Sequence, residues 1–236
     1  MTKELFLTDS YLREFEARVL KHAGRELTLD RTAFYAGGGG QPPDKGRLRV
    51  GPVQAFVVDV KRVGGEVVHV LDSPIPATVE KINGELDWER RYAHMRYHTA
   101  LHVLSGVIWK EFGAKVTGAQ MRQDHARMDF SFPEEWTAEI VDEIERLANL
   151  SLAEERSVRV YDLPREEALR DPDLIRTQVE RVPERVEMVR IVEIEGIDAQ
   201  ADGGTHVENT GEVGQMKITG HKSKGRQNKR IEFTLQ

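Results

Sequence analysis

The hydrophobic pattern of this chain changes its period near residue 87, and this change constrains the fold more than any other feature. Before it, short segments rich in valine and leucine partly alternate apolar and polar residues, as half-buried strands do. Turns containing glycine and proline separate these segments, which predicts a small β-barrel or sandwich. After it, apolar residues recur at three- and four-residue steps over residues 88–112, which predicts an amphipathic helix that stops at Gly113.

The rest of the chain mixes helical and strand patterns. The expected fold class is α+β, with an N-terminal small β-barrel-like domain over residues 1–87 and a two-layer domain of helices on an antiparallel sheet over residues 88–236. In the second domain the pattern predicts helices over 133–153 and 165–171, and strands over 157–163, 185–196, 212–220 and 229–236.

Composition limits the chemistry of the chain and its partners. The formal net charge is −6 over 236 residues, so a nucleic-acid partner has to be met by a local basic patch. The chain has no cysteine, which excludes disulfides and thiolate metal sites and leaves histidine, aspartate and glutamate as metal ligands. No apolar run approaches the length of a membrane span, and the charged N-terminus is unlike a signal peptide. We therefore expect a cytoplasmic protein without a membrane partner.

Two short motifs carry residues that bind metals. His98 and His102 lie one helical turn apart, so both imidazoles leave the same face of the predicted helix. About a hundred residues later, Asp202-Gly-Gly-Thr-His206 can present a carboxylate and an imidazole from a sharp turn. Taken singly, the first motif is more often packing and the second an ordinary turn. Together, His98, His102, Asp202 and His206 form a set that suits zinc.

The combination of motifs resembles a known family. HTALH followed by DGGTHVENTGEVG is similar to the editing domain of alanyl-tRNA synthetase, and more so to the free-standing AlaX editing proteins. LDRTAFYAGGGGQPPDKG resembles the glycine-rich N-terminal segment of that family, and GAQMRQDHARMDFSF resembles the segment between its two metal half-sites. The likeness covers nearly the whole chain, and its length resembles the medium-sized AlaX class.

The resemblance implies an enzyme with one Zn²⁺ per chain, which deacylates alanine tRNA mischarged with serine, and with glycine as a second error. It departs from the family at one ligand, because Asp202 stands where the family has cysteine. Asp202 could bind zinc through one oxygen or stay off the metal and leave three histidines. Two rival functions stay open: a non-catalytic tRNA- or synthetase-binding module with a degenerate site, and a zinc hydrolase acting on another aminoacyl ester.

The resemblance also implies residues around the substrate. Thr32 is expected to read the serine hydroxyl and Gln41 to line the pocket, which makes them catalytic-site candidates beside His98 and His102. A site that hydrogen-bonds the hydroxyl rejects alanine well, because its polar groups would then stay unpaired. Gln120 and the glycine run Gly37–Gly40 are expected near the substrate, the run through close backbone approach. Within the run, the predicted substrate contacts are Gly38, Gly39 and Gly40.

Electrostatic contact with tRNA is expected from a basic run near the C-terminus, although such runs are usually only solvated. Its predicted RNA-binding residues are Lys222, Lys224 and Arg226, followed by Lys229 and Arg230, with Arg90, Arg91 and Arg96 as a possible extension of the patch. The sequence does not separate a monomer from a dimer.

Overall fold

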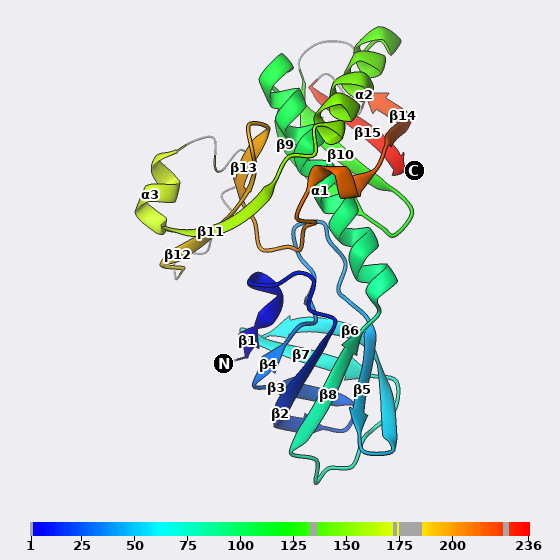
Figure 1. Ribbon diagram of the computed structural model, residues 1–236, viewed down its shortest axis with the longest axis vertical. Coiled ribbons are helices and arrows are strands. Elements are labelled where there is room, and N and C mark those ends of the chain that lie inside the picture. The colour runs from blue at the N-terminus through cyan, green and yellow to red at the C-terminus, as the bar shows by residue number, and fades with distance from the viewer. Residues whose placement is uncertain (1, 133–135, 172–173, 175–185, 224–226) are drawn as a thin grey trace. The chain divides into compact units, whose positions relative to one another are not determined.

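The structure is a computed structural model that describes all residues except 1, 133–135, 172–173, 175–185 and 224–226 (Figure 1). The chain divides into two compact units, Met1–Met95 and Arg96–Gln236. The predicted domain boundary, between residues 87 and 88, falls at the start of helix α1 (Trp88–Phe112), and the two units divide inside that helix.

The first unit is a closed barrel in which the strands follow the order β2-β3-β7-β6-β5-β8. All neighbouring strands in the barrel for which a register is defined run antiparallel. A short parallel pair, β1 (Lys3–Glu4) with β4 (Arg31–Thr32), accompanies it, with the 3-10 turn η1 (Leu5–Leu7) after β1. The barrel strands are β2 (Glu14–Ala23), β3 (Glu26–Leu29), β5 (Gly46–Val50), β6 (Val53–Val63), β7 (Glu66–Leu71) and β8 (Lys81–Leu86).

Alternation along the strands places the apolar side chains inside the barrel. Phe15 and Gly84 are direct partners in β2 and β8, and a Cβ on Gly84 would lie 2.4 Å from the Phe15 ring. The glycine therefore makes room for an aromatic side chain in the core.

The first unit also contains a buried ion pair. The Arg91 guanidinium contacts the carboxylate of Asp44 and donates to the carbonyls of Ser10 and Ala33, and both charged side chains are at most 1% exposed.

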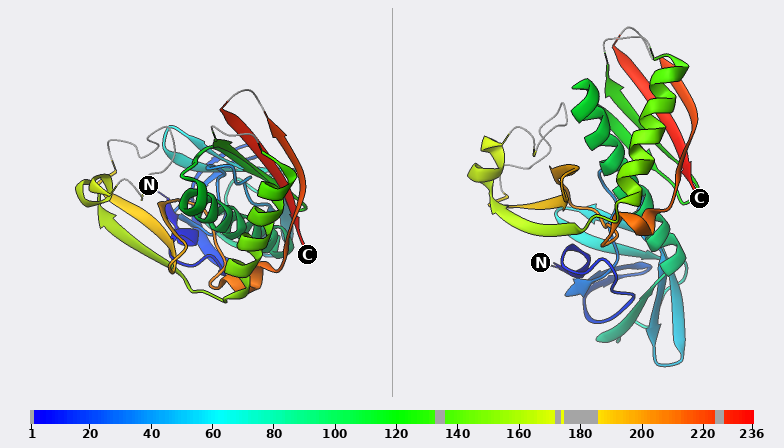
Figure 2. Two further views of the ribbon diagram at one scale, coloured as in Figure 1. Left: turned by 90° about the horizontal axis from the view of Figure 1, so that it is seen from above. Right: turned by 45° about the horizontal axis from the view of Figure 1, so that its top comes forward.

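The second unit contains a four-stranded antiparallel sheet covered by helices. Its strands follow the order β14 (Met216–Ser223), β15 (Asn228–Leu235), β10 (Ala126–Ser131) and β9 (Lys115–Met121). Met128, Ile231 and Phe233 are buried on one face, where the Tyr97 ring of α1 packs against the ring of Phe233. Helices α1 and α2 (Ala138–Ala153) lie on the same side of this sheet in Figures 1 and 2, which gives the two-layer arrangement.

A smaller sheet in the same unit carries the loop that matters for the metal motifs. It consists of β11 (Val158–Pro164), β12 (Met188–Ile194) and β13 (Asp198–Ala201), with α3 (Arg165–Arg170) after β11 and the 3-10 turn η2 (Thr210–Val213) before β14. Gly106 of α1 lets the turn between β12 and β13 approach closely, because a Cβ there would lie 2.5 Å from the carbonyl oxygen of Ile197. This contact places the start of β13 beside α1.

The expected α+β class and the N-terminal barrel are confirmed, and so is the helix over residues 88–112. The second helix was expected from residue 133, but it begins at Ala138. Thr137 is its N-cap, because the Thr137 side chain accepts a hydrogen bond from the Ile140 amide. Residues 133–135 lie outside the described part of the chain. The strand expected over 212–220 begins only at Met216, because the preceding residues form η2. Among the described residues, every helix is too short or too polar to span a bilayer.

Candidate metal centre

Helix α1 presents the first half of the centre. His98 and His102 are both buried on one side of this helix, and their ring centroids are 5.3 Å apart. A helical rise of about 6 Å per four residues accounts for that separation. The pairing of the two imidazoles therefore follows directly from their spacing in the sequence.

The loop after β13 presents the second half. The Asp202 amide donates to the Arg190 carbonyl and the Arg190 guanidinium donates to the Asp202 carbonyl, so β12 fixes the backbone of the loop. The Asp202 carboxylate accepts a 2.6 Å hydrogen bond from the amide of Gly204, which closes a tight turn. The hydroxyl of Thr99 on α1 lies 3.2 Å from His206 Nδ1 and accepts from the Val207 amide, so the loop is joined to the helix.

These elements bring together the four residues of the predicted set. One ligand atom from each of His98, His102, Asp202 and His206 lies within 4.8 Å of the others. The rings of His98 and His206 stack with centroids 4.2 Å apart, and the ring of His102 meets that of His206 edge-on at 4.8 Å. Asp202 Oδ1 lies 3.5 Å from His98 Nε2, and Asp202 Oδ2 lies 3.0 Å from His206 Nε2.

The separations suit a small divalent cation. Ligand atoms at about 2.0–2.1 Å from a tetrahedral zinc lie roughly 3.3 Å from one another, which resembles the shorter separations found here. Three nitrogen donors and one carboxylate also match the preferences of zinc. The residues present therefore fit the ion that the sequence predicts.

The protonation states of these residues also suit a metal. Burial lowers the pKa of His98 to about 4, and the positive charge of His102 opposes protonation further, although Asp202 favours it. Burial, with the nearby His98, holds the pKa of His206 well below its usual range. Burial alone would raise the pKa of Asp202, but His98 and the hydrogen bond with His206 outweigh it and hold that pKa well below its usual range. Neutral imidazoles and an ionised carboxylate are the forms that bind metal ions.

A second layer of residues orients the ligands, and sequence reasoning missed it. His102 Nδ1 lies 2.9 Å from Asp198 Oδ2, and the Asp198 side chain is fully buried. With a proton on Nδ1, the lone pair of His102 is on Nε2, the nitrogen then available to a metal. The Gln200 amide donates to the same carboxylate oxygen and to Ser105 Oγ. Alternation along IDAQAD, which puts Asp198, Gln200 and Asp202 on one face, is the signal that could have found them.

The other site residues expected from the resemblance belong to the first unit. Thr32 is fully buried, its hydroxyl lies 2.8 Å from His69 Nε2 and it accepts from the Phe34 amide. Gln41 is 2% exposed and its backbone pairs with that of Gly38 in both directions. The glycines of the run all have positive φ, between 58° and 146°, which other residues rarely adopt; they are Gly37, Gly38, Gly39 and Gly40.

Gln120 and the basic run lie in the second unit, on the four-stranded sheet. Gln120 is an exposed residue of β9, and Arg127 is its partner on β10. Lys222 is exposed, with its Nζ 3.9 Å from Glu232, whereas Lys224 and Arg226 lie outside the described residues. Lys229 is buried and donates to Ser223 Oγ, so it does not belong to an exposed patch.

Arg230 of the basic run and the arginines expected to extend the patch make structural contacts. Arg230 forms a two-pronged ion pair with Asp129, at 2.6 and 2.7 Å. Arg91 is completely buried and therefore cannot contact RNA. Arg90 and Arg96 donate to the backbone carbonyls of Pro43 and Val213 respectively. The prediction that Arg91 extends the basic patch was wrong, because its guanidinium is buried in an ion pair with the carboxylate of Asp44.

Comparison with known proteins places this centre in a family. Two family profiles match: one described as threonyl and alanyl tRNA synthetase second additional domain, over residues 189–232, and one as tRNA synthetases class II (A), over residues 5–90. The alanyl-tRNA editing protein AlaX-M of Saccharolobus solfataricus is 41% identical over 100% of this chain and 99% of its own length. The chain belongs to the AlaX-M family.

Other relatives agree with this assignment. The AlaX-M protein of Methanosarcina mazei is 42% identical over 100% of the chain and 97% of its own length. An alanine–tRNA ligase of Pyrococcus abyssi is 43% identical over 92% of the chain, but the match covers only 24% of that ligase. This AlaX-M chain is thus similar to one part of a larger synthetase and to the whole of the free-standing editing proteins, as the motifs indicated.

Proposed function

We propose that this AlaX-M protein is an aminoacyl-tRNA deacylase that acts in trans on mischarged alanine tRNA in the cytoplasm. The substrate would be the ester between the 3′ end of the tRNA and serine, with glycine as a second error. The observation that carries the proposal is the buried cluster of three histidines and one aspartate in a chain similar over its full length to alanyl-tRNA editing proteins.

We further propose that His98, His102 and His206 hold one Zn²⁺ together with Asp202. Bound zinc would supply a polarised ester carbonyl and a water of lowered pKa, which are the two needs of ester hydrolysis. Oxygen Oδ2 of Asp202 already accepts the Gly204 amide, which leaves Oδ1 as its more available ligand atom. Asp198 and Thr99 orient the imidazoles of His102 and His206.

Selectivity for serine is proposed for residues of the first unit. Thr32 would read the serine hydroxyl and Gln41 would line the pocket, with the backbone of Gly38–Gly40 next to the acylated adenosine. Their support is the family motif in which they occur, LDRTAFYAGGGGQPPDKG. Positive φ angles along the glycine run mean that side chains there would strain the backbone, so the run is suited to close approach by a ligand.

A deacylation assay tests the proposal. Seryl-, glycyl- and correctly charged alanyl-tRNA would be incubated with the protein, with and without a chelator, and ester loss followed. We expect hydrolysis of the seryl ester, loss of activity with chelator, and no activity in His98→Ala or His206→Ala. His125→Ala, at an exposed histidine, is the matched control and should keep full activity.

The rival functions give different outcomes in the same assay. A binding module would retain tRNA without hydrolysis and would take up no stoichiometric metal from zinc-replete buffer. A hydrolase for another ester would bind zinc but leave seryl-tRNA intact. Full activity in either histidine variant would contradict the proposed metal centre.

A further inference from the structure

An RNA partner needs a positive surface, and the C-terminal run supplies less of one than its sequence indicates. In the described part of this run, Lys229 is buried, Arg230 is paired with Asp129, and Lys222 lies near Glu232. The acids come from neighbouring strands, so the sequence alone does not reveal them. Since the whole chain carries a formal charge of −6, cations without acidic partners are informative wherever they gather.

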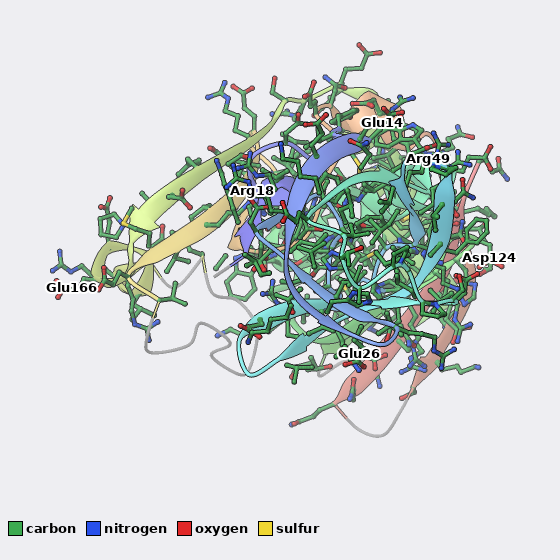
Figure 3. The ribbon with its side chains drawn as sticks, turned by 90° about the horizontal axis from the view of Figure 1, so that it is seen from below. Glu14, Arg18, Glu26, Arg49, Asp124 and Glu166 are labelled. Atoms are coloured by element: carbon green, nitrogen blue, oxygen red, sulfur yellow. The ribbon has the colours of Figure 1, made fainter. Side chains whose placement is uncertain are left out.

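Four cations, two of them outside any ion pair among the described residues, line a groove of about 440 Å³ on the first unit. The groove runs over β2, β8 and β5 and includes Arg31 of β4 and the preceding Asp30. Arg18 and Arg49, both labelled in Figure 3, come from β2 and β5, the two strands that flank β8. Its charged residues are the cations Arg18, Arg31, Arg49 and Lys81 and the acids Glu16 and Asp30.

Two of the cations face each other without compensation. Arg18 and Lys81 are direct partners in the antiparallel pair of β2 and β8, and both are exposed. Like charges opposite each other on a sheet destabilise it. Within the residues that the structure describes, neither side chain forms an ion pair, since Asp30 accepts from the Arg18 amide and the Arg31 guanidinium instead. An anion placed between them would remove this repulsion.

The breadth of the cation array indicates what kind of anion fits. Arg18 and Arg49 lie two strands apart, which corresponds to roughly 10 Å across the sheet. A single small anion cannot contact cations over that span, whereas successive phosphates of a nucleic-acid backbone can. Arg49 forms an ion pair with Glu85 at 2.8 Å, so we expect the strongest phosphate contacts at Arg18 and Lys81.

We propose that this groove binds the phosphate backbone of RNA, with Arg18 and Lys81 as its principal contacts. The inference rests on the proposed function, because the tRNA substrate supplies the phosphates. Backbone contacts of this kind add affinity and carry no sequence information. The groove would therefore hold tRNA without selecting for alanine tRNA.

The test compares two double variants by tRNA binding at several salt concentrations. Arg18→Gln with Lys81→Gln removes the proposed contacts. Lys21→Gln with Lys61→Gln changes the net charge by the same amount on the same barrel, at lysines already paired with Glu66 and Glu26. Two lost phosphate contacts should make the fall in affinity between 50 and 200 mM salt roughly tenfold smaller than in the wild type, since each contributes a slope of about 0.7–0.9.

The control variant should keep the wild-type salt dependence. Equal losses in both double variants would show an effect of net charge and overturn the proposal, and so would an unchanged salt slope in the groove variant. Binding of inorganic phosphate to the groove at low millimolar concentration, without binding of tRNA there, would indicate a small-anion site. That result would also overturn the proposal. Thermal unfolding of the groove variant should show unchanged or increased stability, because a repulsion is removed.

A second readout separates this inference from the proposed function. Deacylation of seryl-tRNA by the groove variant should show a raised KM and an unchanged kcat. No deacylation by the wild type would refute the proposed function, while the binding data for uncharged tRNA would still decide the groove.

Discussion

The carboxylate of Asp198 accepts a hydrogen bond from His102, and replacing it by an amide removes its charge while keeping its size. The side chain is fully buried, and Gln200 donates to the same oxygen, so Asp198→Asn has little room to move. The variant would still accept a hydrogen bond, but it would polarise His102 less and would fix the imidazole less firmly with its lone pair on Nε2.

The size of the effect follows from the role of such outer residues. Loss of a partner that orients a metal-binding histidine typically weakens metal affinity by about 10–100-fold. At about 1.4 kcal/mol for each factor of ten, this is roughly 1.4–2.7 kcal/mol of zinc-binding free energy. Both His102 and Asp198 are buried, so bulk solvent screens their interaction little.

Competition with a chromophoric chelator measures this free energy directly in the folded protein. Asp129→Asn is the matched control, since it neutralises another carboxylate of the same unit, paired with Arg230 and absent from the ligand cluster. We expect weaker zinc binding in Asp198→Asn alone. A zinc affinity within twofold of the wild type in that variant would refute the idea that Asp198 positions His102.

Further predictions concern the barrel and the fourth ligand. Arg91→Met should destabilise the protein to urea by about 3–5 kcal/mol, because Asp44 would remain buried without its partner, and adding Asp44→Leu should recover much of the loss; no recovery would contradict this. Burial lowers the pKa of His69 to about 4, below its value near 6.5 in the unfolded chain, so protons favour unfolding and stability should fall as the pH drops from 6.5 towards 4, by up to about 3 kcal/mol. His69→Gln should make that part of the pH profile of unfolding less steep, because His98 and His206 contribute with the same sign and remain; an unaltered slope would exclude a contribution from His69. Asp202→Cys should keep or tighten zinc binding by chelator competition, and clear loss of the ion would indicate that residue 202 does not face it.

Local periodicity in the sequence was sufficient for several elements. Helix α1 and the pairing of His98 with His102 follow from residue spacing alone, since neighbours one turn apart must share a face. Strand β8 is less evident in the sequence, because KINGEL contains an Asn-Gly pair that is typical of turns. Its Gly84 is explained only by the ring of Phe15 on the partner strand, a contact that no local pattern contains.

Sequence-based prediction of the metal centre was incomplete for the same reason, because some contacts join residues that are far apart in the sequence. The sequence predicted the four candidate ligands, but Asp198 and Thr99 were missed because their roles depend on residues about a hundred positions away. The acidic partners of Lys222 and Arg230 were not evident for a similar reason, since Glu232 and Asp129 are supplied by strand pairing rather than by neighbours in the sequence. Charge compensation across strands is a property of the fold.

The hydrogen bonds of Thr99 join helix α1 to the loop that carries His206 without involving any ion. They span more than a hundred residues of sequence, and the bond between His102 and Asp198 joins α1 to β13, the strand that precedes this loop. Contacts within the polypeptide therefore join the segments that carry the imidazoles, and we expect cation binding to change their structure little. Calorimetric titration should accordingly find a heat-capacity change close to zero, in contrast to the large values of small domains that fold only around their metal.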